Sequence, residues 1–232
     1  MRILAFFNLT KKLLFCIIIE IFIFLVKQIF KEAFMEKVDT KQEFLELFQQ
    51  NIHRDGAKEL LDWLVKTDFF TAPASTRFHS NYEGGLCIHS INVYKRLKKL
   101  VDTEYGDKRS EVISDESIAV IGLLHDICKV NNYKQEVRNT KVDGAWVQKP
   151  VYTVDDKLPF GHGEKSVYMI SGFMKLSREE AMAINWHMGG FDARVIGGAS
   201  WMMSEAYYQY PIATLCHIAD FMATYLDEKL VE

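Results

Sequence analysis

The sequence predicts an all-α domain interrupted by one small β-hairpin. From Val38 onward, apolar residues recur at three- and four-residue intervals, which is the period of amphipathic helices. Residues 133–154 instead carry β-branched and aromatic side chains around Asp143-Gly144, a strong signal for a two-residue hairpin turn. The chain has 232 residues, of which 49% are apolar, enough for one full core and short for two. We therefore expect a single domain over residues 35–232.

The helices before the hairpin are predicted from their apolar spacing and from one N-cap. Three stretches have apolar residues at helical spacing: residues 44–52, 57–67 and 86–101. Residues 69–85 have no sustained period and contain a proline and paired glycines, so an ordered loop is expected there. Ser114 stands before two acidic residues and is the predicted N-cap of a buried helix. This helix should carry His125 and Asp126 in its last turns.

The helices after the hairpin are predicted from their end signals. Ser177 and Glu180 have the spacing of a capping box, ahead of a helix that should end at Gly189-Gly190. Pro211 suits the first turn of a last helix, because that position needs no backbone N–H.

Residues 1–34 differ in character from the rest of the chain. Residues 13–26 are strongly apolar and flanked by lysines, but the run is shorter than the roughly 20 residues of a membrane-spanning helix. It also contains Glu20, and a charge inside a bilayer is costly. The segment could be an inner-membrane anchor, a signal-like segment, or translated sequence ahead of a true start at Met35. We favour the last interpretation, because the residues after Met35 resemble the polar opening of a helical domain.

Charge and cysteine usage narrow the class of protein. With 28 basic and 31 acidic residues the net charge is −3, so no strongly basic surface for duplex nucleic acid is expected. The four cysteines lack C-x-x-C spacing and lie in apolar contexts that suit buried thiols: Cys16, Cys87, Cys128 and Cys216. We expect them to be reduced and the protein to be cytoplasmic.

Four of the seven histidines, together with two aspartates, follow the order H…HD…H…H…D along the chain. These residues are His89, His125, Asp126, His162, His187 and Asp220. Imidazole is a common ligand of transition metals and a carboxylate can bridge two ions, so the set could hold one or two metals. A cation would also explain why an apolar helix ends in two titratable groups, since an unpaired buried charge is costly. Singly, each histidine could instead be a hydrogen-bonded core residue.

This order resembles the HD-domain superfamily of metal-dependent phosphohydrolases, which implies an all-α HD-domain helical core. The motifs that carry the resemblance are "GGLCIHS", "LLHDICK", "GHGEKS", "NWHMGG" and "HIADF". They span the chain from about His79 to Asp220. The likeness is greatest to members with extra histidines between the HD pair and the last aspartate, which bind two metals. The region "HSNYEGGLCIHS" is also similar to the HD domain of bacterial 3′–5′ exoribonucleases.

The resemblance implies a role for each matching residue. His89, His125, Asp126 and Asp220 would bind the first metal, and His162, His187 and the bridging Asp126 the second. The cofactor would be one or two divalent transition metals, of the group Mn, Fe, Ni, Co and Zn. Asp126 and Lys129 would be catalytic, with Lys129 neutralising a phosphate oxygen. His79 could contact substrate or anchor its loop, and His217 could be a partner or an alternative ligand.

The implied activity is cleavage of a phosphomonoester or phosphodiester by a metal-activated hydroxide. A nucleotide is the expected substrate, short single-stranded RNA is an alternative, and a membrane partner is expected only if residues 1–34 are an anchor. The hairpin would form a wall or lid over the site, or a surface excursion that binds nothing. Two other functions fit the same ligand order, namely a di-iron oxygenase of the HD type and a non-catalytic nucleotide-binding module.

Overall fold

The computed structural model describes residues 40–142 and 144–228. The chain divides into two compact units, residues 1–42 and 43–232, and the account below concerns the second. The proposed start at Met35 and the three interpretations of residues 1–34 lie outside the described residues. None of the helices in the described ranges is long and apolar enough to cross a membrane.

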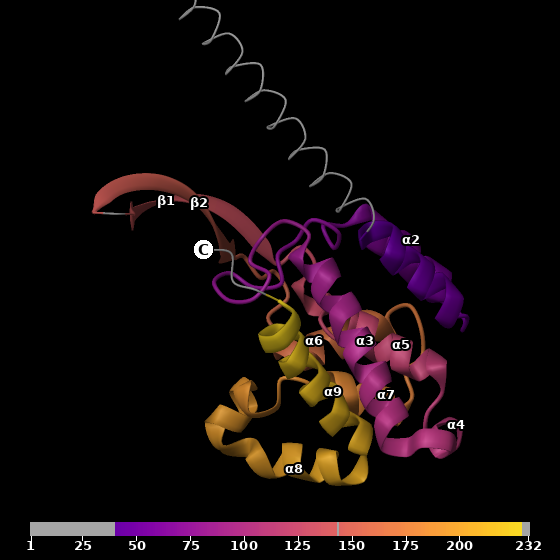
Figure 1. Ribbon diagram of the computed structural model, residues 1–232. Helices are drawn as coiled ribbons and strands as arrows, with labels where there is room; N and C mark the ends of the chain where they lie inside the picture. Colours follow the sequence, from indigo (N-terminus) through magenta and orange to yellow (C-terminus); the bar gives the residue numbers. More distant parts are fainter. Residues whose placement is uncertain (1–39, 143, 229–232) are drawn as a thin grey trace, which may run out of the picture. The chain divides into compact units, whose positions relative to one another are not determined.

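The described part of the chain is helical apart from one hairpin (Figure 1). A first helix covers residues 40–51. The α-helices that follow are α2 (Ala57–Lys66), α3 (Gly85–Tyr105), α4 (Arg109–Val112), α5 (Asp115–Leu124), α6 (His162–Ser171), α7 (Arg178–Asn185), α8 (Ser200–Gln209) and α9 (Pro211–Met222). The short 3₁₀ or π segments are η1 (Gly106–Lys108), η2 (Ile127–Lys129), η3 (Gly189–Phe191), η4 (Val195–Ala199) and η5 (Ala223–Asp227). The strands are β1 (Tyr133–Val142) and β2 (Ala145–Val154). The predicted all-α class with an inserted hairpin is confirmed.

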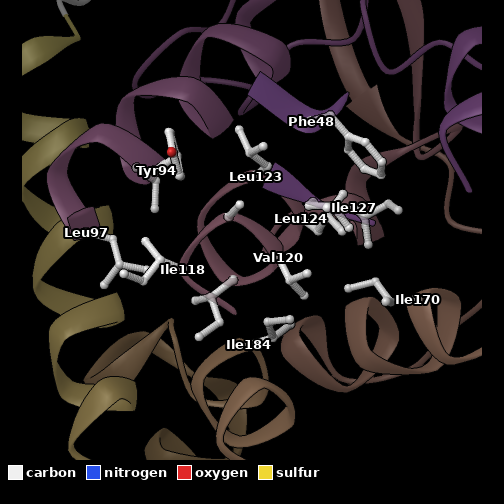
Figure 2. Packing of buried hydrophobic residues seen from close by; sticks show 14 of the residues in the cluster. Phe48, Tyr94, Leu97, Ile118, Val120, Leu123, Leu124, Ile127, Ile170 and Ile184 are labelled. Carbon is white, nitrogen blue, oxygen red and sulfur yellow. The ribbon is translucent and has the colours of Figure 1, made fainter. Parts of the chain in front are cut away.

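Helix α5 is the centre of the core because it is apolar on every side. All its residues from Ile118 to Leu124 are buried, and it packs against α3 and α7 (Figure 2). Gly122 allows the close approach to α3, since a Cβ there would lie 2.5 Å from the Tyr94 Cα. Helix α9 packs against α3 and α7, and α6 packs against α7 and η2. The start of α3, the ends of α5, α7 and α9 and the start of α6 meet around one region.

The predicted end signals are largely confirmed. Ser114 caps α5 by accepting a hydrogen bond from the Ser117 N–H, and Ser177 and Glu180 form the capping box of α7. Pro211 is the first residue of α9. Two ends differ from prediction. Helix α5 stops at Leu124, so that His125 is its C-cap, and α7 stops at Asn185 ahead of Gly189.

The hairpin is joined to the helices at its base. Tyr133 pairs with Val154 in an antiparallel ladder that continues to the turn. The ammonium group of Lys165, a buried residue of α6, donates to Asn132 and Asp156, which flank the two strands. The strands themselves are largely exposed. The predicted wall or lid therefore has an anchored base, and its action on a substrate stays a prediction.

Candidate metal centre

Five separate segments bring the six predicted ligands together. His89 lies on α3, His125 and Asp126 follow α5, His162 begins α6, His187 follows α7, and Asp220 lies on α9. In space the imidazole rings form a row in which each ring lies next to the following one. The ring centroids are 5.1 Å apart for His89 and His125, 4.9 Å for His125 and His187, and 5.1 Å for His187 and His162. The chain therefore folds so that residues up to 131 positions apart in sequence surround one small volume.

The carboxylate of Asp126 lies in the middle of these rings. Its Oδ1 is 2.7 Å from His162 Nε2 and 3.5 Å from His187 Nε2. Its Oδ2 is 3.4 Å from His89 Nε2 and 3.6 Å from His125 Nε2. Asp220 Oδ1 lies 3.2 Å from His89 Nε2. Each oxygen of Asp126 thus faces one of the two ligand sets that the resemblance implies.

Hydrogen bonds on the outer side of two rings determine which nitrogen faces inward. His125 Nδ1 is 2.9 Å from the Gly122 carbonyl, and His187 Nδ1 is 2.7 Å from the Ile184 carbonyl. A carbonyl can only accept, so each Nδ1 carries the hydrogen and each neutral ring directs an Nε2 lone pair inward. His187 Nε2 is buried without a hydrogen-bond partner in the described structure. An unpaired buried acceptor is costly, and a cation would satisfy it.

The spacing of the inward atoms fits ligands around an ion. The four separations from Asp126 and Asp220 to His89, His125 and His187 lie between 3.2 and 3.6 Å. Ligand atoms about 2.1 Å from a tetrahedral metal are separated by roughly 3.4 Å. Three buried imidazoles and two carboxylates are also the donor set that divalent transition metals prefer. These residues could hold a metal.

The protonation of the clustered side chains depends on their burial, their hydrogen bonds and the charges of neighbouring side chains. Burial lowers the pKa of His125 to about 3, so this ring is neutral near pH 7. Burial opposes a charge on His89 as well, but its hydrogen bonds with Asp220 and Glu228 raise its pKa to about 10. Burial alone would raise the pKa of Asp126, yet Lys129 and the surrounding histidines hold it well below its usual range. The carboxylates are therefore ionised, and metal binding here would release a proton from His89.

Lys129 and His79, the predicted substrate contacts, both adjoin the cluster. Lys129 Nζ lies 2.5 Å from Asp126 Oδ2, and the charge of Asp126 raises the pKa of the ammonium group although burial opposes it. The His79 ring is 4.7 Å from that of His89, and its Nε2 is buried without a hydrogen-bond partner in the described structure. Burial and then the charge of His89 lower the pKa of His79 to about 4. Contact with a substrate stays a prediction for both residues.

Sequence reasoning missed Glu228. Its Oε1 lies 2.9 Å from His89 Nδ1 and 3.3 Å from Asn92 Nδ2, and its Oε2 accepts a hydrogen bond of 2.6 Å from Ser80 Oγ. A carboxylate on the outer nitrogen of a ligand histidine fixes the ring and raises its basicity. No local pattern marks Glu228, which is one acid among several near the end of the sequence.

His217 is a backbone partner of His187. Its Nδ1 lies 2.8 Å from the His187 carbonyl oxygen, and its ring occupies the space that a Cβ on Gly189 would fill. This position holds the segment after α7 against α9. The interpretation of His217 as a partner therefore fits its contacts better than that of an alternative ligand.

The family model described as "HD domain" matches residues 86–222. The dihydroneopterin 2′,3′-cyclic phosphate phosphodiesterase of Methanocaldococcus jannaschii is 39% identical over 84 residues. This alignment covers 36% of the present chain and 31% of that protein, so most of each chain lies outside it. No solved structure matches the chain.

Proposed function

Because the chain belongs to the HD domain family, we propose that it is a metal-dependent phosphohydrolase acting on a small phosphomonoester or phosphodiester. The observation that carries this proposal is the convergence of four imidazole rings on the two oxygens of the buried Asp126 carboxylate. Bound cations would stabilise such a set of imidazoles and carboxylates. The segment that matches the HD domain contains all six predicted ligands. We infer that His89, His125, Asp126 and Asp220 hold one ion, and that His162, His187 and Asp126 hold a second.

Divalent metals at such a site lower the pKa of a bound water toward neutrality, which supplies a nucleophile for attack on phosphorus. The protein's own contribution is to hold the ligand rings in one tautomer. The carbonyls of Gly122 and Ile184 keep the Nδ1 hydrogens of His125 and His187 on the outer side. Lys129 places a positive charge beside Asp126, where it would offset the charge of a phosphate oxygen.

A cyclic phosphodiester is the first substrate to test. The relative from Methanocaldococcus jannaschii is named for a 2′,3′-cyclic phosphate substrate. The net charge of −3 favours a small nucleotide over a long nucleic acid, because backbone binding relies on many basic contacts. Tyr133 stands at the base of the hairpin. Burial raises the pKa of its hydroxyl group to about 12, while the charge of nearby Lys129 acts to lower it. We infer that this aromatic side chain borders the phosphate-binding position.

The proposal is tested by metal analysis followed by a panel of phosphoesters. Freshly purified protein should contain one or two transition-metal ions per chain and release phosphate or nucleoside monophosphate with Mn, Co, Ni or Zn. Asp126→Asn should lose both metal and activity while keeping its helical circular dichroism. The control is Asp62→Asn, which removes an exposed carboxylate paired with Lys58 on the protein surface. Normal turnover by Asp126→Asn would refute the proposed site.

Lys129→Ala separates phosphate binding from metal binding. We expect turnover to fall by roughly tenfold or more, because a charge-assisted contact to phosphate is lost, while the metal content is unchanged. Lys58→Ala, which removes an exposed lysine also paired with an aspartate, should change neither. Loss of metal in Lys129→Ala would show that Lys129 supports the site and does not act on substrate.

The same purified protein distinguishes the two alternative functions. Two irons with an oxygen-dependent reaction would favour the oxygenase. Nucleotide binding without turnover, in excess of each metal, would favour the non-catalytic module.

A further inference from the structure

We propose that three exposed aromatic side chains beside the metal centre, Phe191, Phe221 and Tyr225, form an aromatic platform on which a flat ring of the substrate stacks. This inference rests on the proposed function and deepens it, because it names the class of substrate. That substrate is a phosphate ester whose alcohol carries a planar aromatic heterocycle, as in a nucleotide.

Two of the predicted ligands mark the side of the metal centre that faces solvent. The side chains of His162 and Asp220 are 31% and 16% exposed. The side chains of the other four predicted ligands are no more than 2% exposed. A substrate phosphate would therefore approach the centre from the side on which α6 begins and α9 carries Asp220.

Two residues of the platform lie on a stretch of chain that contacts the metal centre at both ends. Phe221 follows Asp220 directly on α9, and Tyr225 lies farther along, in η5. The same stretch ends at Glu228, whose Oε1 lies 2.9 Å from His89 Nδ1. The backbone on either side of these two aromatic rings is therefore tied to the metal centre.

The three aromatic rings adjoin one another and are open to solvent. The ring centroid of Phe221 lies 6.5 Å from that of Phe191, with the planes 15° apart, and 4.6 Å from that of Tyr225. The residues are 59% (Phe191), 47% (Phe221) and 65% (Tyr225) exposed. Phe191 comes from η3, the segment that follows His187, so the platform joins two ligand-bearing parts of the chain. Contiguous apolar patches on a soluble protein commonly mark a binding surface.

The chemistry of the platform suits the uncharged, flat part of a substrate whose phosphate lies at the metal centre. Its residues offer aromatic faces and one phenolic hydroxyl group, and none of them is charged. Metal ions that bind only the phosphate distinguish poorly between one phosphate ester and another, whereas rings beside them can bind the rest of the molecule. Stacking on aromatic side chains tolerates every base, because each base has a π-face. The platform should therefore accept several bases and disfavour esters that lack a ring.

Two esters that differ in the base test this inference: adenosine 2′,3′-cyclic phosphate and 1-O-methylribose 2′,3′-cyclic phosphate. The full chain with added manganese should have the higher kcat/KM for the adenosine ester. In Phe221→Leu this preference should fall by roughly tenfold, mainly through a higher KM, because stacking stabilises the ground state and the transition state alike. Phe221→Tyr keeps an aromatic ring and should keep the preference. The matched control is Tyr208→Leu, which removes an exposed ring on α8 and should not change it.

A binding measurement separates the platform from catalysis. The fluorescence anisotropy of ethenoadenosine 2′,3′-cyclic phosphate reports binding whether or not the ester is cleaved, because substrate and product both carry the ring. Phe221→Leu and Tyr225→Leu should each weaken this binding by roughly tenfold, whereas Tyr208→Leu should not. The metal content should be the same in all variants. Should Phe221→Leu fail to fold, Tyr225→Leu supplies the same comparison.

The outcomes distinguish the platform from the proposed function. Equal kcat/KM for the two esters in the wild type, or equal ester binding by the wild type and the platform variants, would overturn the platform and leave the phosphohydrolase proposal standing. Ester binding that depends on Phe221, without turnover of either ester with any metal, would overturn the phosphohydrolase proposal alone. A wild-type dimer that Phe221→Leu dissociates, with ester binding unchanged, would show that the rings form a subunit interface and would overturn the platform.

Discussion

Removal of the Glu228 carboxylate should weaken metal binding through His89 without removing any ligand. Glu228→Ala deletes the acceptor for His89 Nδ1, Asn92 Nδ2 and Ser80 Oγ. The side chain is 1% exposed, so water does not readily replace it. Glu228→Gln is the milder change, because its amide oxygen can still accept from His89 while the amide nitrogen can donate to Ser80.

The magnitude follows from these contacts. Loss of an outer hydrogen-bond partner of a ligand histidine lowers metal affinity by about 10–100-fold, equivalent to roughly 1.4–2.8 kcal/mol. Glu228→Ala also leaves buried donors without an acceptor, at about 1–3 kcal/mol each, so its free energy of unfolding should fall by a few kcal/mol. Glu228→Gln keeps most of the hydrogen bonds and should lie at the small end of both ranges.

The assay is a competition titration for zinc against a chromophoric chelator, with urea unfolding of the same samples. The control is Asp227→Asn. Asp227 is the neighbouring carboxylate and pairs with Arg96 where both side chains are partly exposed, and such pairs contribute about 0–1 kcal/mol. Wild-type zinc affinity in Glu228→Ala would refute the reasoning, and equal losses in Glu228→Ala and Asp227→Asn would show that the effect is not specific to His89.

Two further predictions concern stability away from the candidate site. The buried carboxylate of Glu180 forms a two-point ion pair with Arg54, and although burial opposes ionisation this contact holds its pKa below the usual value. Arg54→Ala should lower the free energy of unfolding by about 3 kcal/mol near pH 7 in urea titrations. The difference in stability between the wild type and the variant should shrink as the pH falls through the lowered pKa of Glu180. A difference in stability that does not change with pH would contradict this prediction. Gly122→Ala should destabilise the protein by about 1–3 kcal/mol in thermal melts, because its Cβ would meet the Tyr94 backbone, whereas Gly197→Ala, with open space around it, should not.

Local signals predicted most of the fold. Capping residues, helical periodicity and the Asp-Gly turn each act within a few residues, so the elements they mark could be placed from sequence alone. The paired glycines predict that α7 ends at Gly189-Gly190, but the helix ends earlier, with Trp186 as its C-cap. Helix α8 was not predicted. Its apolar and polar residues do not separate onto two faces, and Trp201 on this helix is 69% exposed.

The candidate site was predicted only as far as residue type and order allow. The four histidines and two aspartates share a recognisable order, and the structure brings them together. The pairing of Lys129 with Asp126 depends on the turn of η2, and the position of Cys128 depends on how η2 packs against α6. Such contacts are tertiary, so sequence spacing alone could not predict them.

The outermost contacts of His89 come from outside the segment that matches the HD domain. Ser80 precedes that segment and Glu228 follows it, yet the two residues hydrogen-bond to each other directly beside His89. Ser80 has a φ of 44°, a left-handed conformation that is costly for a residue with a side chain, so its surroundings hold it there. The loop before α3 and the end of the described chain therefore jointly orient one inner ligand. Two HD domains with the same six inner residues can then differ in metal affinity through residues that the shared motifs do not include.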